Sequence, residues 1–385
     1  MQAKDMGLHL TDSLHNKRPE ETREQIIDAE MRRRVWWHLA STDWSTSLAG
    51  SPHEGTYSVQ VKHMQVRRPR NITDEDLATQ PADFSRPVEE ATANSYYLQR
   101  ISLAEVCREA ADLLWDIYAV RDPEQIEYDR VKQLDAKFAG LLDNLPNALR
   151  LDHLKGGDQR TESVTTNHLM KQSHFTYLTV EVRRSKVHLP FLLRAERDHR
   201  YAFSRTQCLA SARNVLALRH VLPHEQSSSG GPVFLIGVLH HFFCAMVVLV
   251  MDVCVNKAAG HEEERRQEVK EACGILERAR ERSSVANTFL ESLMTILKKH
   301  GVRCQNPTAP PVSTGFAAGW GTAAGINDFT STTPILADPN LAVDGVMSDT
   351  LNFDDLWQSY FDMGPQLDPE SWNDIFNDLE MRVDP

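Results

Sequence analysis

The chain has 385 residues, of which 41% are apolar, and a formal net charge of −12, so it is long enough to bury a sizeable core. The charge is uneven. From residue 304 onward the chain carries 13 acids and one base, Arg382, which leaves 41 acids and 41 bases in residues 1–303. A neutral body excludes nucleic-acid binding by bulk positive charge, and an acidic tail indicates a basic or mixed partner surface.

Six cysteines are spread along the chain, and no two lie within four residues of each other. This spacing excludes zinc-finger and CxxC sites within these residues. With no signal-peptide pattern at the start, we expect a reduced intracellular compartment, without a disulfide framework. The cysteines, two of which are Cys107 and Cys208, are expected to pack in the core.

Helical periodicity runs through most of the first 300 residues, whereas strand-like alternation is nearly absent. The sequence therefore predicts an all-α protein. Proline residues at 69, 81 and 87 punctuate a predicted loop that follows Tyr57 and lasts until about Ala91. Helices are predicted over residues 28–48, 97–118, 131–145, 164–194, 203–222, 233–257, 261–282 and 285–299.

The first of these helices, residues 28–48, has a tryptophan-rich apolar arc on a helical wheel. The arc is formed by Val35, Trp36, Leu39 and Ala40, and is extended by Trp37, Trp44 and Leu48. Such a face is typical of a core helix. Contact of the neighbouring Arg32, Arg33 and Arg34 with phosphate is the alternative.

Two charged residues, Arg32 and Asp43, project into the same arc. They are eleven residues apart, about 16 Å along a helix, and so cannot pair with each other. If they are buried, each needs a partner elsewhere, because an unpaired buried charge is very costly.

Residues 233–255 are almost wholly apolar and long enough to cross a membrane. His240, His241 and Asp252 interrupt the run, and a charge at mid-membrane is costly. We therefore expect a helix buried in a helical protein, and no membrane partner.

Enzyme motifs are absent from the sequence. His261-Glu-Glu-Glu-Arg lacks the second histidine of HExxH, and there is no GxSxG elbow. His240 and His241 are adjacent, so they point about 100° apart on a helix and make a poor metal pair. Gly319, Gly321 and Gly325 imitate a phosphate loop but follow no predicted strand. We expect no enzyme and no metal site in these residues.

Residues 304–345 are rich in Pro, Thr, Ala and Gly and contain no Lys or Arg, which predicts a flexible linker. Residues 346–385, the acidic tail, contain two amphipathic segments. The second has a start signal, with Asp368 as N-cap and Pro369 at the first helical position. The large apolar residues recur at helical spacing: Phe353, Leu356, Trp357, Tyr360 and Phe361, then Trp372, Ile375, Phe376 and Leu379.

Each segment is too short for a stable isolated helix. The composition is typical of an acidic activation segment that folds onto a partner's groove, here a transcriptional coactivator. The alternative is that these helices dock on the body as ordinary packing.

Several motifs occur in the order and spacing of a known family. Arg32-Arg-Arg-Val-Trp-Trp is followed by Asp43 and the turn Gly50-Ser51-Pro52, and Gly7-Leu8-His9 precedes it. Pro69-Arg70-Asn71, Leu134 to Pro146, His188-Leu-Pro190-Phe-Leu and Cys208 to Arg213 come later. Together, over about residues 5–300, they resemble the fungal-specific transcription factor domain. Ser51 departs from the family's Gly-Arg-Pro turn, and an extra stretch, His53 to Val59, follows it.

The resemblance implies a nuclear regulator of RNA polymerase II transcription. Residues 1–303 would be the regulatory domain, residues 304–345 the linker and residues 346–385 the activation segment. Family members bind DNA through an N-terminal cysteine cluster that holds zinc; this chain has no such cluster, so we expect it to be N-terminally truncated and to hold no cofactor. The rival interpretations are a helical interaction module or small-molecule sensor outside transcription.

Overall fold

A computed structural model describes residues 2–13, 22–49, 55–120, 127–151, 164–221, 232–257, 260–281 and 283–299. Within these ranges every regular element is helical, so the all-α prediction is confirmed. The predicted linker 304–345 and the acidic tail 346–385 lie outside the described residues, as do Gly50 and Pro52.

Eight long helices make up the body that the structure describes. They are α2 (Arg23–Thr46), α4 (Ser95–Val120), α5 (Tyr128–Asp143), α7 (Val164–Leu192), α8 (Ala202–Ala217), α9 (Pro232–Val255), α10 (Glu262–Ala279) and α11 (Ser284–Lys299). The shorter elements are α1 (Gln2–Asp5), η1 (Leu8–Leu10), η3 (Val61–His63), α3 (Asp74–Thr79), η5 (Asn147–Leu149), η6 (His199–Tyr201) and η7 (Leu218–Val221).

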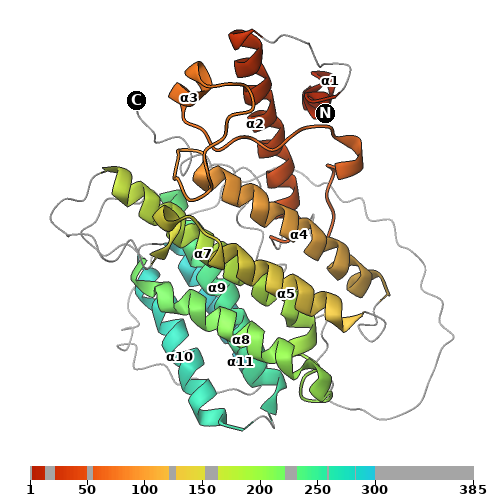
Figure 1. The fold of residues 1–385 in the computed structure, drawn as a ribbon. Helices are drawn as coiled ribbons and strands as arrows, with labels where there is room; N and C mark the ends of the chain where they lie inside the picture. Colours follow the sequence, from red (N-terminus) through yellow and green to blue (C-terminus); the bar gives the residue numbers. More distant parts are fainter. Residues whose placement is uncertain are drawn as a thin grey trace, which may run out of the picture.

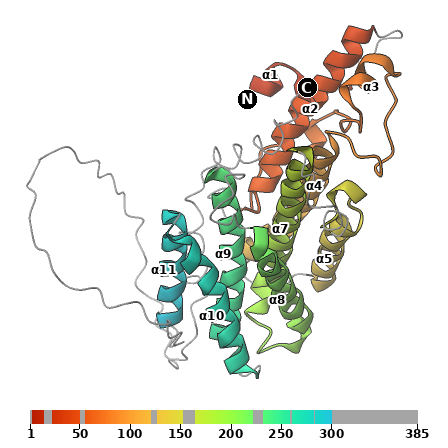
Figure 2. The same cartoon turned by 90° about the vertical axis from the view of Figure 1, so that its left-hand side faces the viewer.

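The helices are arranged around α7 and α9. Helix α7 packs against α4, α5, α8 and α9, and α9 also packs against α8, α10 and α11. In Figure 2, α7 and α8 lie between α5 and α9, α10 and α11 lie on the other side of α9, and α2 extends from one end of this bundle. At that end, α1 and α3 flank α2 (Figure 1).

Helix α9 is the centre of the largest apolar core. Its residues Gly237–Val255 are long and apolar enough to cross a membrane, but 94% of that stretch is buried inside the protein. Its one acid, Asp252, pairs with Arg205 of α8 at 2.7 Å and with Arg265 of α10 at 3.0 Å. The expectation of a buried core helix is therefore confirmed.

A long-range contact ties α7 to the end of α2. Arg183 is buried, and its Nη1 donates to the carbonyl of Leu48 at 2.5 Å, across 135 positions of sequence. The guanidinium faces the carbonyl end of α2, where a cation is favoured by the helix dipole.

Helices α2 and α3 differ most from the prediction. Helix α2 begins at Arg23 rather than Asp28, because Thr22 and Gln25 form a reciprocal capping box. Helix α3 lies inside the predicted loop, and Thr73 and Asp76 form the same kind of capping box at its start. Leu77 is the one buried apolar residue of α3. A single buried residue shows no periodicity, so the sequence pattern did not predict this helix.

Candidate functional site

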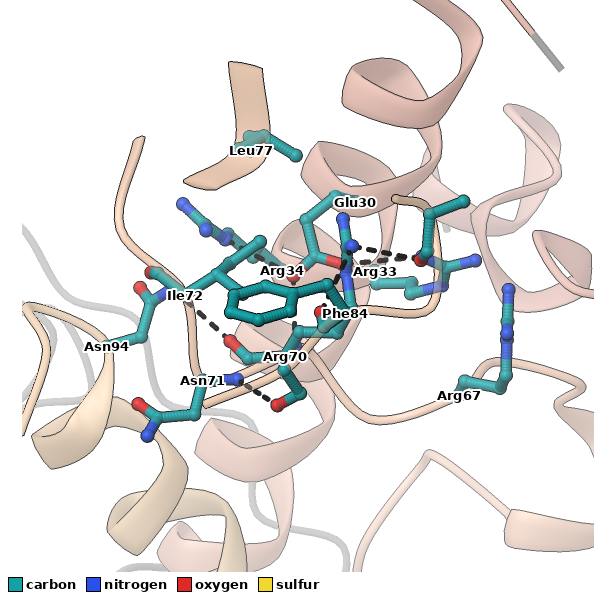
Figure 3. Close-up of polar contacts among 12 residues, drawn as sticks. Glu30, Arg33, Arg34, Arg67, Arg70, Asn71, Ile72, Leu77, Phe84 and Asn94 are labelled. Atoms are coloured by element: carbon teal, nitrogen blue, oxygen red, sulfur yellow. Dashed lines mark hydrogen bonds and ion pairs between the residues drawn. The ribbon is translucent and has the colours of Figure 1, made fainter. Parts of the chain in front are cut away.

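Glu30, fully buried in α2, is the centre of a charge cluster at this end of the molecule (Figure 3). Its Oε2 accepts from Arg33 Nη1 at 3.3 Å and from Arg70 Nε at 3.0 Å. Its Oε1 accepts the backbone N–H of Arg70 at 3.0 Å and lies 3.6 Å from Arg34 Nε. One buried carboxylate thus compensates three guanidinium groups and fixes the turn at Arg70 onto α2.

Asp12 extends the cluster to the N-terminal residues. Its carboxylate accepts from Arg33 Nη2 at 2.6 Å and Arg33 Nε at 3.0 Å, and from Arg67 Nε at 2.9 Å. Burial alone would raise the pKa of Asp12, but the hydrogen bonds and charge of Arg33, together with Arg67, more than offset it and lower the pKa to about 2. The side chain of Arg33 is only 7% exposed, so it is not free to contact phosphate.

Three tryptophans of α2 hold the segment that follows. Trp37 Nε1 donates to the carbonyl of Arg67 at 2.8 Å, and Trp44 Nε1 donates to the carbonyl of Val59 at 2.8 Å. Trp36 Nε1 points to Met64 Sδ at 3.5 Å. Because each indole also buries its ring, the tryptophans serve both the core and the course of residues 59–67.

Asn71 closes the next loop. Its Nδ2 donates to the carbonyls of Pro87 at 2.8 Å and Glu90 at 2.9 Å, and Thr92 Oγ1 donates to its Oδ1 at 2.7 Å. Together with Arg70, it anchors residues 70–92 without a long helix. The motif Pro69-Arg70-Asn71 thus has a structural role, because it fixes the course of this loop.

Asp43 and Arg32 find separate partners. Asp43 is partly buried, and its Oδ2 accepts the backbone N–H groups of Val59 at 2.7 Å and Ser58 at 2.9 Å. Arg32 Nη2 donates to the carbonyl of Met6 at 2.8 Å. Both side chains keep some exposure to solvent, so neither is the fully buried charge that its position in the apolar arc could have made it.

The predicted apolar arc is wrong at two positions. Val35 is 46% exposed and Leu39 is 41% exposed, whereas Trp36, Trp37, Ala40 and Trp44 are buried. Residues 35 and 37 lie about 200° apart on a helix, so one face cannot bury both. The large indoles determine which face turns inward, since they bury the most apolar area.

A second polar network lies between α5, α7 and α8. His188, fully buried, contacts Asp135 Oδ1 through Nε2 at 2.9 Å and Ser204 Oγ through Nδ1 at 3.0 Å. Arg184 donates to both oxygens of Asp135, at 2.5 and 2.9 Å, and Tyr128 Oη lies 2.7 Å from Ser204 Oγ. Burial alone would raise the pKa of Asp135, but His188 and Arg184 offset it and lower the pKa to about 2.

The Ser204–His188–Asp135 array has the residue types of a hydrolase triad. All three side chains are buried, so a substrate carbonyl would have to enter the packed junction of the helices. Asp135 is also committed to Arg184. The arrangement therefore acts as a polar clamp across three helices. Pro190, two residues on, lies in the last turn of α7, where its carbonyl accepts from Arg194 Nη1 at 3.0 Å.

The histidine pair of α9 is buried, as expected. His241 Nδ1 donates to the carbonyl of Gly237 at 2.6 Å, and burial lowers its pKa to about 3. The described cysteines are buried thiols, and burial raises the pKa of Cys107 to about 11. Among the described residues, no group of three or more His, Cys, Asp or Glu side chains could hold a metal ion.

Four residues that build these networks were not predicted from the sequence as site residues: Asp12, Glu30, Asp135 and Ser204. Glu30 has a local signal, because it stands three and four residues before Arg33 and Arg34 on a helix. The partners of Asp12 and Asp135 come from distant segments, and no local pattern predicts them. Gly50, Pro52 and all nine apolar tail residues lie outside the described residues.

The described part of the chain is thus an all-α body in which buried arginine–carboxylate pairs fix a tryptophan-lined helix. Several known fungal proteins are similar to the chain. "Probable transcription factor lepB" of Aspergillus flavus is 36% identical over 386 residues, 99% of this chain and 68% of that protein. The chain belongs to a family of fungal transcription factors, and is a transcription regulator.

The second relative, "Agnestins biosynthesis cluster transcription factor AgnL11" of Paecilomyces divaricatus, is 30% identical over 77% of this chain and 42% of its own length. The third, "Zn(2)-C6 fungal-type transcription factor mpsB" of Macrophomina phaseolina, is 27% identical over 59% of this chain and 30% of its own length. The chain thus spans less than half of these two relatives. No family model matches the sequence, and no solved structure matches it.

Proposed function

We propose that the chain is the regulatory and activating part of a fungal zinc-cluster transcription factor that works in the nucleus. In this proposal residues 1–303 are the fungal-specific regulatory domain, and residues 346–385 are an activation segment that binds coactivators. DNA contact would depend on a zinc cluster that residues 1–385 do not contain. The observation that carries the proposal is the 36% identity to a named transcription factor over 99% of the chain.

The geometry of the body supports the regulatory role. The family-like residues Arg33, Asp43 and His188 each fix a contact between segments that are distant in sequence. They build a scaffold and expose no catalytic group. The Zn(2)-C6 name of the Macrophomina relative supports a zinc cluster in this family.

The acidic tail would supply the activating contact. A face of four or five large side chains contributes about 1.5–3 kcal/mol each on burial. Ordering the segment costs about 2–5 kcal/mol, and association has its own entropy cost. A roughly micromolar contact, near −8 kcal/mol, should remain. The apolar residues should hold the complex, and the acids should speed the encounter.

The test fuses residues 346–385 to an unrelated DNA-binding domain and measures a reporter in yeast. The fusion should activate it. Changing Phe353, Trp357, Trp372 and Phe376 to Ala should abolish the activity, because the apolar face is lost.

The matched control changes Asp354, Asp355, Asp374 and Asp378 to Asn, and should reduce activity less. A silent fusion, or one in which only the aspartate changes matter, would contradict a helix-in-groove activation segment.

A further inference from the structure

A groove of about 560 Å³ runs between α8 and α10, with Met294 of α11 at its side. Its apolar lining includes Leu216 of α8 and the small residues Ala272 and Gly274 of α10. A Cβ built at Gly274 would lie 3.6 Å from Arg278 Nη1, which is an ordinary contact distance. The volume is sufficient for two or three large side chains of an incoming helix.

The rim of this α8–α10 groove carries uncompensated positive charge. Arg219, Lys270 and Arg278 line it and have no ion-pair partner among the described residues. Of the three acids of the groove, Glu268 pairs with Arg213 at 2.6 Å and Glu277 lies 3.8 Å from Arg280. Glu271 accepts only from the neutral Gln267, at 3.0 Å, so one negative charge stands against the three free cations and the rim keeps an excess of positive charge. An apolar floor with free cations at its edge fits an amphipathic helix whose polar side is acidic.

We propose that the occupant is the acidic tail of the same chain. Residues 353–361 and 372–379 each place large apolar side chains at helical spacing and aspartates on the other sides. Two or three of the aromatic residues of one segment would fill the apolar floor, while the aspartates of that segment, Asp354 and Asp355 or Asp374 and Asp378, approach the free cations. This inference rests on the proposed function only in treating residues 346–385 as amphipathic segments.

The linker is long enough for this contact. Between Lys299, where α11 ends, and Phe353 lie 53 residues, which as a flexible chain span about 40 Å. Because Met294 of α11 already lines the groove, the chain leaves α11 close to it. A tethered segment has an effective concentration on the order of 1 mM. An intrinsic affinity as weak as about 100 μM would therefore keep the tail docked roughly nine-tenths of the time.

Docking in the groove would compete with the binding of a coactivator to the tail. A coactivator that binds the same apolar face of the tail must displace it from the groove, and its apparent affinity falls by the fraction of tail that is free. The body would then set how much coactivator is needed.

Hydrogen–deuterium exchange of the purified full chain, without coactivator, tests the docking. Replacing Phe353, Trp357, Trp372 and Phe376 with Ala should raise exchange in residues 213–219 and 267–278 by roughly 10-fold, because the groove loses its cover. Reversing the rim charges with Arg219→Glu, Lys270→Glu and Arg278→Glu should raise exchange in residues 353–379. All three changes are on exposed side chains, so folding should be preserved.

The matched control is Lys4→Glu, Lys62→Glu and Lys257→Glu, which makes the same change in net charge at exposed positions away from the groove. It should leave the exchange of the tail unchanged. About 1 M salt should mimic the rim variant, since it screens the charge pairs. Equal exchange in wild type and both groove-directed variants would overturn the docking.

This outcome is separable from the reporter test, in which the body is absent. An active fusion with unchanged exchange would refute the docking and leave the activation segment in place. A silent fusion with the expected exchange changes would refute the activation segment and support the docking.

Discussion

His188 Nε2 lies 2.9 Å from Asp135 Oδ1, and both residues are buried between α5 and α7. The other ring nitrogen of His188 contacts Ser204 of α8 at 3.0 Å. A single imidazole therefore couples three helices, and the carboxylate beside it must stay ionised to accept from Arg184 as well. The stability of this junction should depend on pH.

We expect the free energy of unfolding to fall as the pH is lowered from about 4 toward 2. The folded pKa of Asp135, about 2, lies below the ordinary value of 3.8, so its contribution is present above 3.8 and is lost as the folded carboxylate protonates. A shift of this size corresponds to roughly 2 kcal/mol.

Urea unfolding of wild type and Asp135→Asn measures this effect. Their free energies of unfolding, plotted against pH, should converge as the pH falls through this window. Asp129→Asn, exposed on the same helix, should keep the wild-type slope, and a constant difference for Asp135→Asn would refute the assignment.

Glu30→Gln should destabilise the body by about 3–5 kcal/mol, because it removes the buried carboxylate that Arg34 and Arg70 share, while Arg33 keeps Asp12. The melting temperature should drop by about 6–20 °C. Differential scanning calorimetry measures it. Glu24→Gln, on the exposed side of the same helix, should change stability by less than about 0.5 kcal/mol; similar losses in both variants would mean that the cluster has no special role.

Asp43→Ala should cost about 1–3 kcal/mol, since two backbone N–H groups lose their acceptor. A fully buried charge would have cost more, but Asp43 keeps some exposure. Asp43→Asn retains one acceptor oxygen and should cost less than half as much. Chemical denaturation compares both with Asp28→Ala, which alters an exposed acid of α2. If all three variants were as stable as the wild type, Asp43 would not be what stabilises the Ser58–Val59 turn.

The chain alone should show no sequence-specific duplex binding at physiological salt. Residues 1–303 have zero net charge, and arginines of the described body such as Arg33, Arg70 and Arg184 pair with carboxylates. Non-specific affinity should be weaker than the ~10⁻⁴–10⁻⁶ M typical of DNA-binding proteins. A gel-shift complex on a defined site that survives competitor DNA would contradict this.

Periodicity predicted the long helices well, because each buries a wide apolar stripe. Helix α5 shows this, with Val131, Leu134 and Phe138 buried at helical spacing. Short elements were missed where polar capping, and not apolar spacing, sets the structure, as at Thr73. The helical wheel of α2 placed Val35 on the buried face, which is wrong, because it counted aliphatic residues and tryptophans as equally apolar.

The polar networks were beyond local sequence reasoning. Arg70 reaches Glu30 from 40 positions away, and His188 reaches Asp135 from 53. Only the tertiary fold brings such partners together. The residues of the family-like motifs could be named from the sequence, but not their partners.

The bond between Arg183 and the carbonyl of Leu48 closes a loop of 135 positions, and this has a kinetic consequence. Closing so long a loop costs chain entropy before any contact repays it, so we expect the bond to form late, after the folding barrier. Interactions that form after the barrier slow the escape from the native state without speeding its formation. Arg183 should therefore lengthen the lifetime of the folded body, and by holding α2 onto α7 it should delay the separation of the tryptophan-rich end from the bundle.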